Sequence, residues 1–146
     1  MSMDSTPGVA SRGTQVSRHA CLRAMPARLL VVEDDLDLSI VFTRVARSVL
    51  PGVLIDWTVE YEEALGFLRQ NQYDAVIADY LLRGMYSGLA LYPHCLIRQP
   101  RAAFAVMSAY PMTNVLATRG PRRCPFLRKP FTIAECRDFL TRMLVN

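Results

Sequence analysis

Five polar residues that can take part in chemistry each follow a short apolar run of the chain: Glu33, Asp34, Asp79, Ser108 and Lys129. Carboxylates that are brought close together repel one another and acquire raised pKa values unless a cation neutralises them. Their convergence would predict a hard divalent metal. Magnesium suits them best, because it takes oxygen ligands and keeps waters that leave room for a phosphoryl group. A carboxylate such as Asp79 can also attack phosphorus and form an acyl phosphate.

Of the seventeen Lys and Arg residues in the chain, Lys129 is the only lysine. An ammonium is a compact charge that fits one anionic oxygen in a tight site, whereas the planar arginine fork needs more room. Lys129 and the hydroxyl of Ser108 could therefore bind phosphoryl oxygens opposite Asp79. The alternative is that the one lysine falls at this position by chance.

The hydrophobic pattern predicts a scaffold that brings these residues together. Short apolar runs alternate five times with amphipathic stretches, which is typical of an α/β domain with a parallel sheet and helices on both faces. Ligands of such sheets bind outside the carboxyl ends of the strands, where the polar residues fall. The expected strands are 29–32, 53–59, 73–78, 102–107 and 124–128, and the expected helices are 36–50, 60–70, 87–98, 113–118 and 132–144.

Length and composition favour one soluble domain. The 146 residues suffice for a single core, and no uncharged apolar run approaches the roughly 20 residues of a membrane span. The net charge of +4 is concentrated in residues 1–28, which hold four arginines and one aspartate, so nucleic-acid binding is not expected. The four cysteines lack metal-binding spacing, which favours reduced thiols and a cytoplasmic location. We expect a flexible extension over 1–27 and a domain over 28–146.

Four motifs occur in order, each at an expected strand end: Leu29-Leu-Val-Val-Glu-Asp-Asp35, Asp79, Ser108-Ala109 and Lys129-Pro-Phe131. Together they resemble the receiver domains of two-component response regulators, and the likeness spans roughly residues 28 to 145. The resemblance implies a flavodoxin-like, doubly wound (βα)5 fold with strand order 2-1-3-4-5. It also implies a cis peptide bond between Lys129 and Pro130.

The resemblance implies a role for each candidate residue. Asp79 would accept the phosphoryl group, and Mg²⁺ would bind Asp34 and Asp79 directly, Glu33 through water, and the backbone carbonyl of Leu81. Lys129 would contact the phosphoryl group. Ser108 would swing toward it, and Phe126 would rotate inward as the switch aromatic. The structural alternatives are that Asp34 or Asp35 caps the following helix, that Ser108 is a helix cap, and that Phe126 is plain core.

The sequence departs from the family in the loop after Asp79. Arg83 replaces a usual proline, and the segment 84–88 looks one residue longer. Arg83 would either approach the phosphoryl group or point into solvent, and we expect solvent. Leu81 and Tyr110 occupy positions that influence water access to the acyl phosphate in this family. Both are bulky, so we expect slow self-dephosphorylation.

The resemblance implies a single-domain response regulator that is phosphorylated by a sensor histidine kinase or a histidine phosphotransfer protein. Because the chain ends after the fifth expected helix, we expect a switch, not an enzyme, that contacts a downstream protein; a homodimer is left open. The alternatives are a phosphorylation-independent adaptor and, less favoured, a magnesium-dependent aspartyl phosphatase or phosphotransferase.

Six arginines predict either a basic face for an acidic partner or a solvated surface: Arg119, Arg122, Arg123, Arg128, Arg137 and Arg142.

Overall fold

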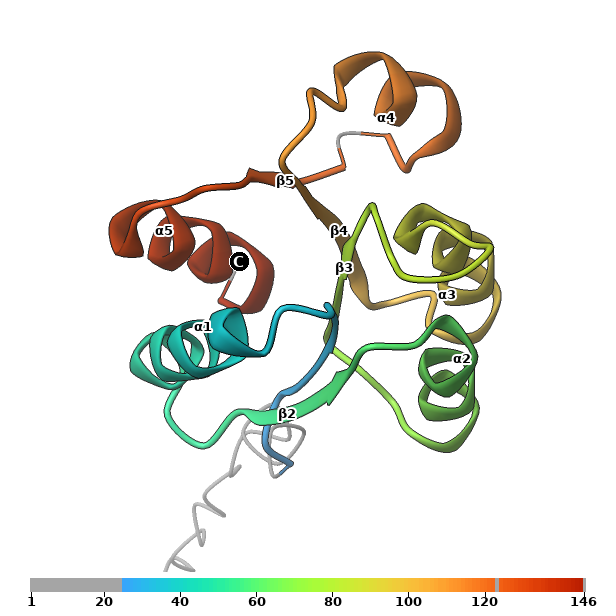
Figure 1. The fold of residues 1–146 in the computed structure, drawn as a ribbon. Coiled ribbons are helices and arrows are strands. Elements are labelled where there is room, and N and C mark those ends of the chain that lie inside the picture. The colour runs from blue at the N-terminus through green and yellow to red at the C-terminus, as the bar shows by residue number, and fades with distance from the viewer. Residues whose placement is uncertain (1–24, 123, 146) are drawn as a thin grey trace, which may run out of the picture.

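The computed structural model describes residues 25–122 and 124–145. Five parallel strands form one central sheet in the order β2-β1-β3-β4-β5 (Figure 1), so the predicted flavodoxin-like order is confirmed. The strands are β1 (Arg28–Val32), β2 (Leu54–Thr58), β3 (Ala75–Asp79), β4 (Ala103–Ser108) and β5 (Phe126–Arg128).

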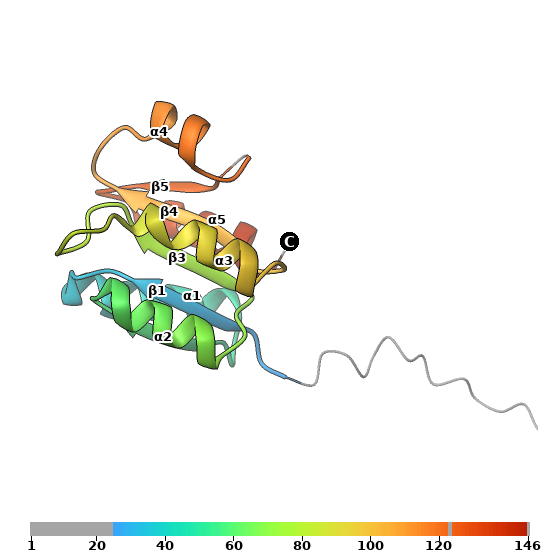
Figure 2. The same ribbon diagram turned by 90° about the vertical axis from the view of Figure 1, so that its right-hand side faces the viewer.

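Helices cover both faces of the sheet, as Figures 1 and 2 show: α1 and α5 lie on one face, and α2 and α3 on the other. In the part of the chain that the structure describes, no helix is long and apolar enough to cross a membrane. The helices are α1 (Leu36–Val49), α2 (Tyr61–Gln70), the 3₁₀ helix η2 (Gly88–Leu91), α3 (Tyr92–Arg98), α4 (Thr113–Arg119) and α5 (Ile133–Leu144).

The alternation of side chains along β1 divides the core between the two faces. Leu29 and Val31 pack into the cluster beneath α1 and α5. Leu30 and Val32 pack into the cluster beneath α2 and α3. All four are fully buried. A central parallel strand is buried on both sides, which explains why β1 reads as a continuous apolar run without polar alternation.

Two strands begin two residues later than expected, because other groups bind the residues before them. Tyr73 does not start β3, since its N–H donates to Oε1 of Gln99 at 3.0 Å. The fifth strand begins at Phe126 and not at Cys124. Cys124 lies in a turn, where its N–H donates to the carbonyl of Pro121 at 3.0 Å, and Pro125 has no N–H to donate to the sheet.

The expected helix over 87–98 is divided into η2 and α3. Pro93 falls in the first turn of α3. A proline is tolerated there, because the N–H groups of a first turn have no partner within the helix. Pro93 thus lies where a helix can begin, inside the range expected to form one helix.

Side-chain caps start two helices at the carboxyl edge of the sheet. Asp35 caps α1, accepting the N–H groups of Asp37 and Leu38 at 3.0 and 3.2 Å, which confirms the capping alternative for this residue. Thr132 and Glu135 form a capping box at the start of α5. The Lys129–Pro130 peptide is cis, as expected. Residues 1–24 of the expected N-terminal extension lie outside the described residues.

Candidate functional site

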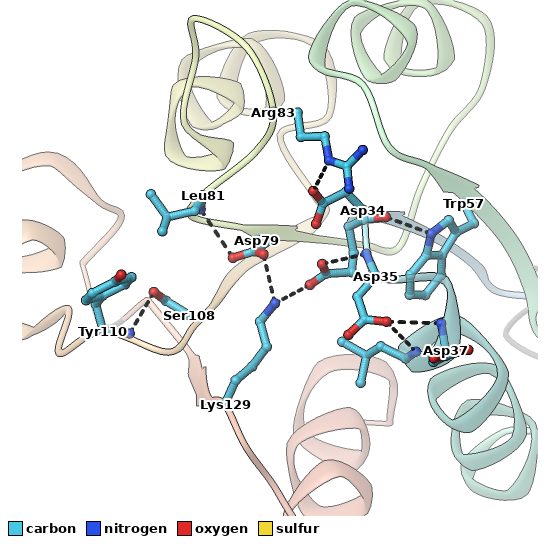
Figure 3. Close-up of polar contacts among 12 residues, drawn as sticks. Asp34, Asp35, Asp37, Trp57, Asp79, Leu81, Arg83, Ser108, Tyr110 and Lys129 are labelled. Carbon is cyan, nitrogen blue, oxygen red and sulfur yellow. Dashed lines mark hydrogen bonds and ion pairs between the residues drawn. The ribbon is translucent and has the colours of Figure 1, made fainter.

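The carboxyl ends of four strands bring the candidate residues to one edge of the sheet (Figure 3). Asp79 and Ser108 are the last residues of β3 and β4, and Glu33 and Lys129 directly follow β1 and β5. β1 and β3 are neighbours, although α1, β2 and α2 separate them along the chain. The strand order therefore reverses between them, which is where open α/β sheets bind ligands.

Lys129 holds two buried carboxylates. Its Nζ donates to Oε2 of Glu33 at 2.5 Å and to Oδ2 of Asp79 at 2.8 Å. Glu33 is fully buried and Asp79 is 6% exposed. Burial alone would lower the pKa of Lys129, but the hydrogen bonds to Asp79 and Glu33 outweigh it and raise the pKa. The ammonium therefore stays protonated at neutral pH.

Glu33 is fixed through both its side chain and its backbone. Its Oε1 accepts the N–H of Asp35 at 3.0 Å, and its carbonyl accepts the indole N–H of Trp57 at 2.9 Å. Burial raises the pKa of the Glu33 carboxyl and the charge of Asp79 adds to the rise, while Lys129 and the Asp35 amide offset part of it. The charged form of this carboxyl thus depends on Lys129.

The carboxylates of Glu33, Asp34 and Asp79 offer oxygens that all lie within 4.8 Å of one another. Such oxygens are the ligands that hard divalent cations prefer. The charges fit as well, because three carboxylates exceed the two side-chain cations that contact them, Lys129 and Arg83. This acidic cluster could hold a metal ion.

The loop between β3 and η2 folds tightly back onto β3. The Leu81 N–H donates to Oδ1 of Asp79 at 3.2 Å, and the Gly88 N–H donates to the carbonyl of Tyr80 at 3.1 Å. A Cβ atom at Gly88 would lie 2.0 Å from the carbonyl oxygen of Asp79, so only glycine fits. The backbone of Leu81 is thus beside Asp79, and the metal contact expected of its carbonyl stays a prediction.

Arg83, near the tip of this loop, corrects one expectation. Instead of simply pointing into solvent, it donates from Nε to Oδ2 of Asp34 at 2.8 Å. Its side chain is 84% exposed, whereas that of Asp34 is 25% exposed. Gly84, with φ +110°, turns the chain immediately afterwards. Sequence reasoning marked Arg83 as unusual but had no signal for its partner 49 positions away.

Solved structures share this fold. A response regulator from Thermotoga maritima is 19% identical with a TM-score of 0.69, and the match covers 84% of this chain and 100% of that one. A response regulator receiver domain from Methylobacillus flagellatus is 27% identical with a TM-score of 0.64, over 82% and 99% of the chains. The chain has the receiver-domain fold. In sequence, no family model and no curated protein matches it.

A third receiver-fold structure adds chemistry to the comparison. It is a response regulator protein from Burkholderia pseudomallei, 22% identical with a TM-score of 0.65, and the match covers 80% of this chain and 66% of that one. That crystal structure contains a phosphorylated aspartic acid, a calcium ion and citrate.

The two residues expected to switch in a receiver fold are not the partners of the Lys129 ammonium, which bonds to Glu33 and Asp79, although the Ser108 carbonyl accepts the backbone N–H of Lys129 at 2.9 Å. Ser108 is buried and its Oγ accepts the N–H of Tyr110 at 3.1 Å, so its hydroxyl stabilises the local turn that follows β4 (Figure 3). Phe126 is half-buried. It lines one surface groove beside α5 and another beside α4. Phe126 thus lies at the surface between two helices, outside both clusters of buried residues, and its rotation stays a prediction.

The predicted basic face carries mixed charges. The groove beside α5 is lined by Arg128 and Arg142 together with Glu135 and Asp138. Arg123 lies outside the described residues, and the docking of an acidic partner stays a prediction. The other arginines of this set are all exposed: Arg119, Arg122, Arg128, Arg137 and Arg142.

Proposed function

We propose that the chain is a phospho-acceptor switch, in which Asp79 receives a phosphoryl group from a histidine kinase or a histidine phosphotransfer protein. The observation that carries this proposal is the environment of Asp79. The carboxylate lies at the carboxyl end of β3, with Lys129 on Oδ2 and the Leu81 N–H on Oδ1. A carboxylate oxygen of Asp79 attacks phosphorus, the bond from phosphorus to the donor imidazole breaks, and its electron pair returns to that imidazole.

The other charged residues prepare the site for a phosphoryl group. Lys129 already contacts the acceptor carboxylate, so its ammonium can move a short distance onto a phosphoryl oxygen. Mg²⁺, bound by Asp34 and Asp79, with Glu33 through water and the Leu81 carbonyl, would supply positive charge to the incoming phosphoryl oxygens. The phosphorylated aspartic acid and calcium ion of the Burkholderia pseudomallei protein support this assignment.

The phosphorylated state would be signalled through a protein contact. A phosphoryl group on Asp79 offers Ser108 an acceptor, which draws its hydroxyl away from the N–H of Tyr110. Phe126 then rotates toward the vacated space and changes the surface between α4 and α5 for a downstream partner. Leu81 and Tyr110 flank the site with bulky side chains that are 52% and 58% exposed. Their bulk screens the acyl phosphate from attacking water and slows its hydrolysis.

One observation favours a second candidate function. Lys129 and Arg83 contact all three carboxylates of the acidic cluster. A receiver fold stabilised in this way can bind a partner without being phosphorylated, as an adaptor.

Incubation with acetyl phosphate and Mg²⁺, followed by intact-mass measurement, separates the two candidates. We expect one added phosphoryl group on the wild type and on Asp138→Asn, an exposed carboxylate of α5, and none on Asp79→Asn. An unmodified wild-type protein would favour the adaptor. Continuous release of phosphate over many turnovers would instead favour an aspartyl phosphatase.

A further inference from the structure

We propose that Arg83 is an internal competitor of the metal for Asp34, so that cation binding displaces the loop that carries Arg83. This inference rests on the proposed function, because it concerns the same candidate metal site. The Nε to Oδ2 contact of 2.8 Å occupies one of the two oxygens that Asp34 can offer a cation. A guanidinium and a divalent cation on the same carboxylate also repel each other, so each weakens the binding of the other.

The exposure of the two partners makes Arg83 the cation that yields. Asp34 is the more buried partner, with 25% of its side chain exposed, whereas Arg83 approaches from solvent with 84% of its side chain exposed. Exposed ion pairs contribute little to the free energy of folding, so breaking this contact costs little free energy. Lys129 differs, because it contacts two buried carboxylates and is 21% exposed itself. Metal binding therefore displaces Arg83 and leaves Lys129 in place.

The loop is built so that this displacement reaches the surface. Its far end is fixed, because Gly88 packs against the backbone of Asp79. Near its tip, Tyr86 stacks on Tyr61 of α2 with ring centroids 4.6 Å apart. Arg83 and both tyrosines line a groove of about 510 Å³ with Glu60, Met85 and neighbouring residues. When Arg83 leaves Asp34, the wall of this groove changes, so metal occupancy alters the surface beside α2.

Trp57 provides a direct readout of the site. It is the only tryptophan of the chain, and its indole N–H donates to the carbonyl of Glu33 at 2.9 Å. Titrating Mg²⁺ alone, without a phosphodonor, and following Trp57 emission gives the affinity for the wild type and Arg83→Gln. We expect Arg83→Gln to bind Mg²⁺ about three to five times more tightly, as the loss of a weak competing ion pair allows. An unchanged or weaker affinity in this variant would overturn the proposal.

Two controls separate competition from the general loss of a positive charge. Arg101→Gln removes an exposed arginine at the opposite edge of the sheet, and its Mg²⁺ affinity should match the wild type. In an Asp34→Asn background, Arg83→Gln should no longer change the affinity. If the gain persists there, Arg83 acts by charge alone and the competition is excluded.

The Nε–H resonance of Arg83 tests the displacement itself. It is identified in ¹⁵N-correlated spectra by its absence from Arg83→Gln. It should move over the same Mg²⁺ concentrations that change the Trp57 emission. A resonance that stays in place at saturating Mg²⁺, or the absence of Mg²⁺ binding to both proteins, would contradict the inference. The acetyl phosphate experiment reports on Asp79 separately, so the two proposals can fail independently.

Discussion

The two edges of the sheet each carry a cluster of charged residues, and the two clusters are balanced differently. At the amino edge, Arg28 donates from Nε to Oδ2 of Asp56 at 2.8 Å, and the Tyr73 hydroxyl donates to the same oxygen at 2.7 Å. The Arg28 guanidinium also lies 5.5 Å from the centre of the Tyr73 ring. In this ion pair one positive charge faces one negative charge, and the carboxylate of Asp74 accepts the backbone N–H of Arg28 at 2.8 Å.

At the carboxyl edge, three carboxylates face two cations, of which Arg83 is largely exposed. The excess of negative charge is costly in a partly buried site unless a further cation binds. The balanced amino edge contributes to stability, whereas the unbalanced carboxyl edge is suited to binding. Substitutions at the two edges should therefore have different consequences.

Lys129→Met should give the largest loss of stability. It leaves Glu33 and Asp79 buried without their cation, and removing one partner of a buried ion pair costs about 3 kcal/mol or more. Urea unfolding measures this loss at pH 7. Mg²⁺ should bind at least as tightly as in the wild type, because Lys129, whose positive charge beside the site repels the ion without being displaced, is gone.

Lys129→Arg is the matched variant, because it keeps the charge. It should retain the fold and the metal site and yet respond weakly to phosphorylation, since the guanidinium fork fits the pocket poorly. Amide chemical shifts of Ser108 and Phe126, measured with and without acetyl phosphate, report that response. Normal switching in this variant would show that the site does not require a lysine and that the one lysine falls at this position by chance.

Two glycines, one at each edge, should differ in their tolerance of alanine. At Gly88, an added Cβ collides with the carbonyl oxygen of Asp79, so Gly88→Ala should cost about 2 to 3 kcal/mol and disturb the acceptor. At Gly52, in the turn before β2, nothing lies within 4 Å and only φ +84° opposes a side chain. Gly52→Ala should therefore cost about 1 kcal/mol. Urea unfolding tests both, and equal losses would contradict the steric argument.

Sequence patterns predicted most of the scaffold because they report local order. Period-two burial, helical spacing and caps depend on neighbours in the chain, and the expected strand over 29–32 and the helix over 132–144 each agree with the structure to within a residue or so. The resemblance then supplied the strand order. That order was sufficient to predict that Glu33, Asp79 and Lys129 meet at one edge.

Contacts set by the paths of loops were not predictable in this way. The pair between Arg83 and Asp34 depends on a turn at Gly84 and on the anchoring of Gly88, and no periodicity encodes either feature. The ion pair of Arg28 and Asp56 was missed for a related reason. It joins the first residue of β1 to the middle of β2, and only the register of the finished sheet brings them together.

Asp56→Ala should separate the stabilities of the two edges. The variant loses a charge-assisted bond from Arg28 and the bond from the Tyr73 hydroxyl, which predicts a cost of about 2 kcal/mol. Because the Asp56 side chain bonds to Arg28 and Tyr73, outside the acidic cluster, the Mg²⁺ affinity reported by Trp57 should not change. A loss of metal affinity equal to that of Asp34→Asn would show that the two clusters are coupled.

A fall in pH should remove stability contributed by Asp56 at the amino edge and relieve the cost of ionising Glu33 at the carboxyl edge. This is the smallest effect that we expect. Burial alone would raise the pKa of Asp56, but the hydrogen bonds from Arg28 and Tyr73 outweigh it and lower the pKa below the ordinary 3.8. Its contribution is therefore present above pH 3.8 and is lost as the pH falls through the lowered value. Burial raises the pKa of Glu33 above 4.5, so its contribution is present below pH 4.5 and is lost as the pH rises through the raised value.

Two isosteric variants make this difference measurable by urea unfolding at pH 3, 5 and 7. The deficit of Asp56→Asn relative to the wild type should shrink on going from pH 7 to pH 3, because the wild type loses the benefit of the ionised carboxylate. Glu33→Gln should compare more favourably with the wild type at pH 7 than at pH 3, because it removes a buried carboxylate that is costly to ionise. If both variants followed the same pH profile, the charge balance of the two edges would not be what distinguishes them.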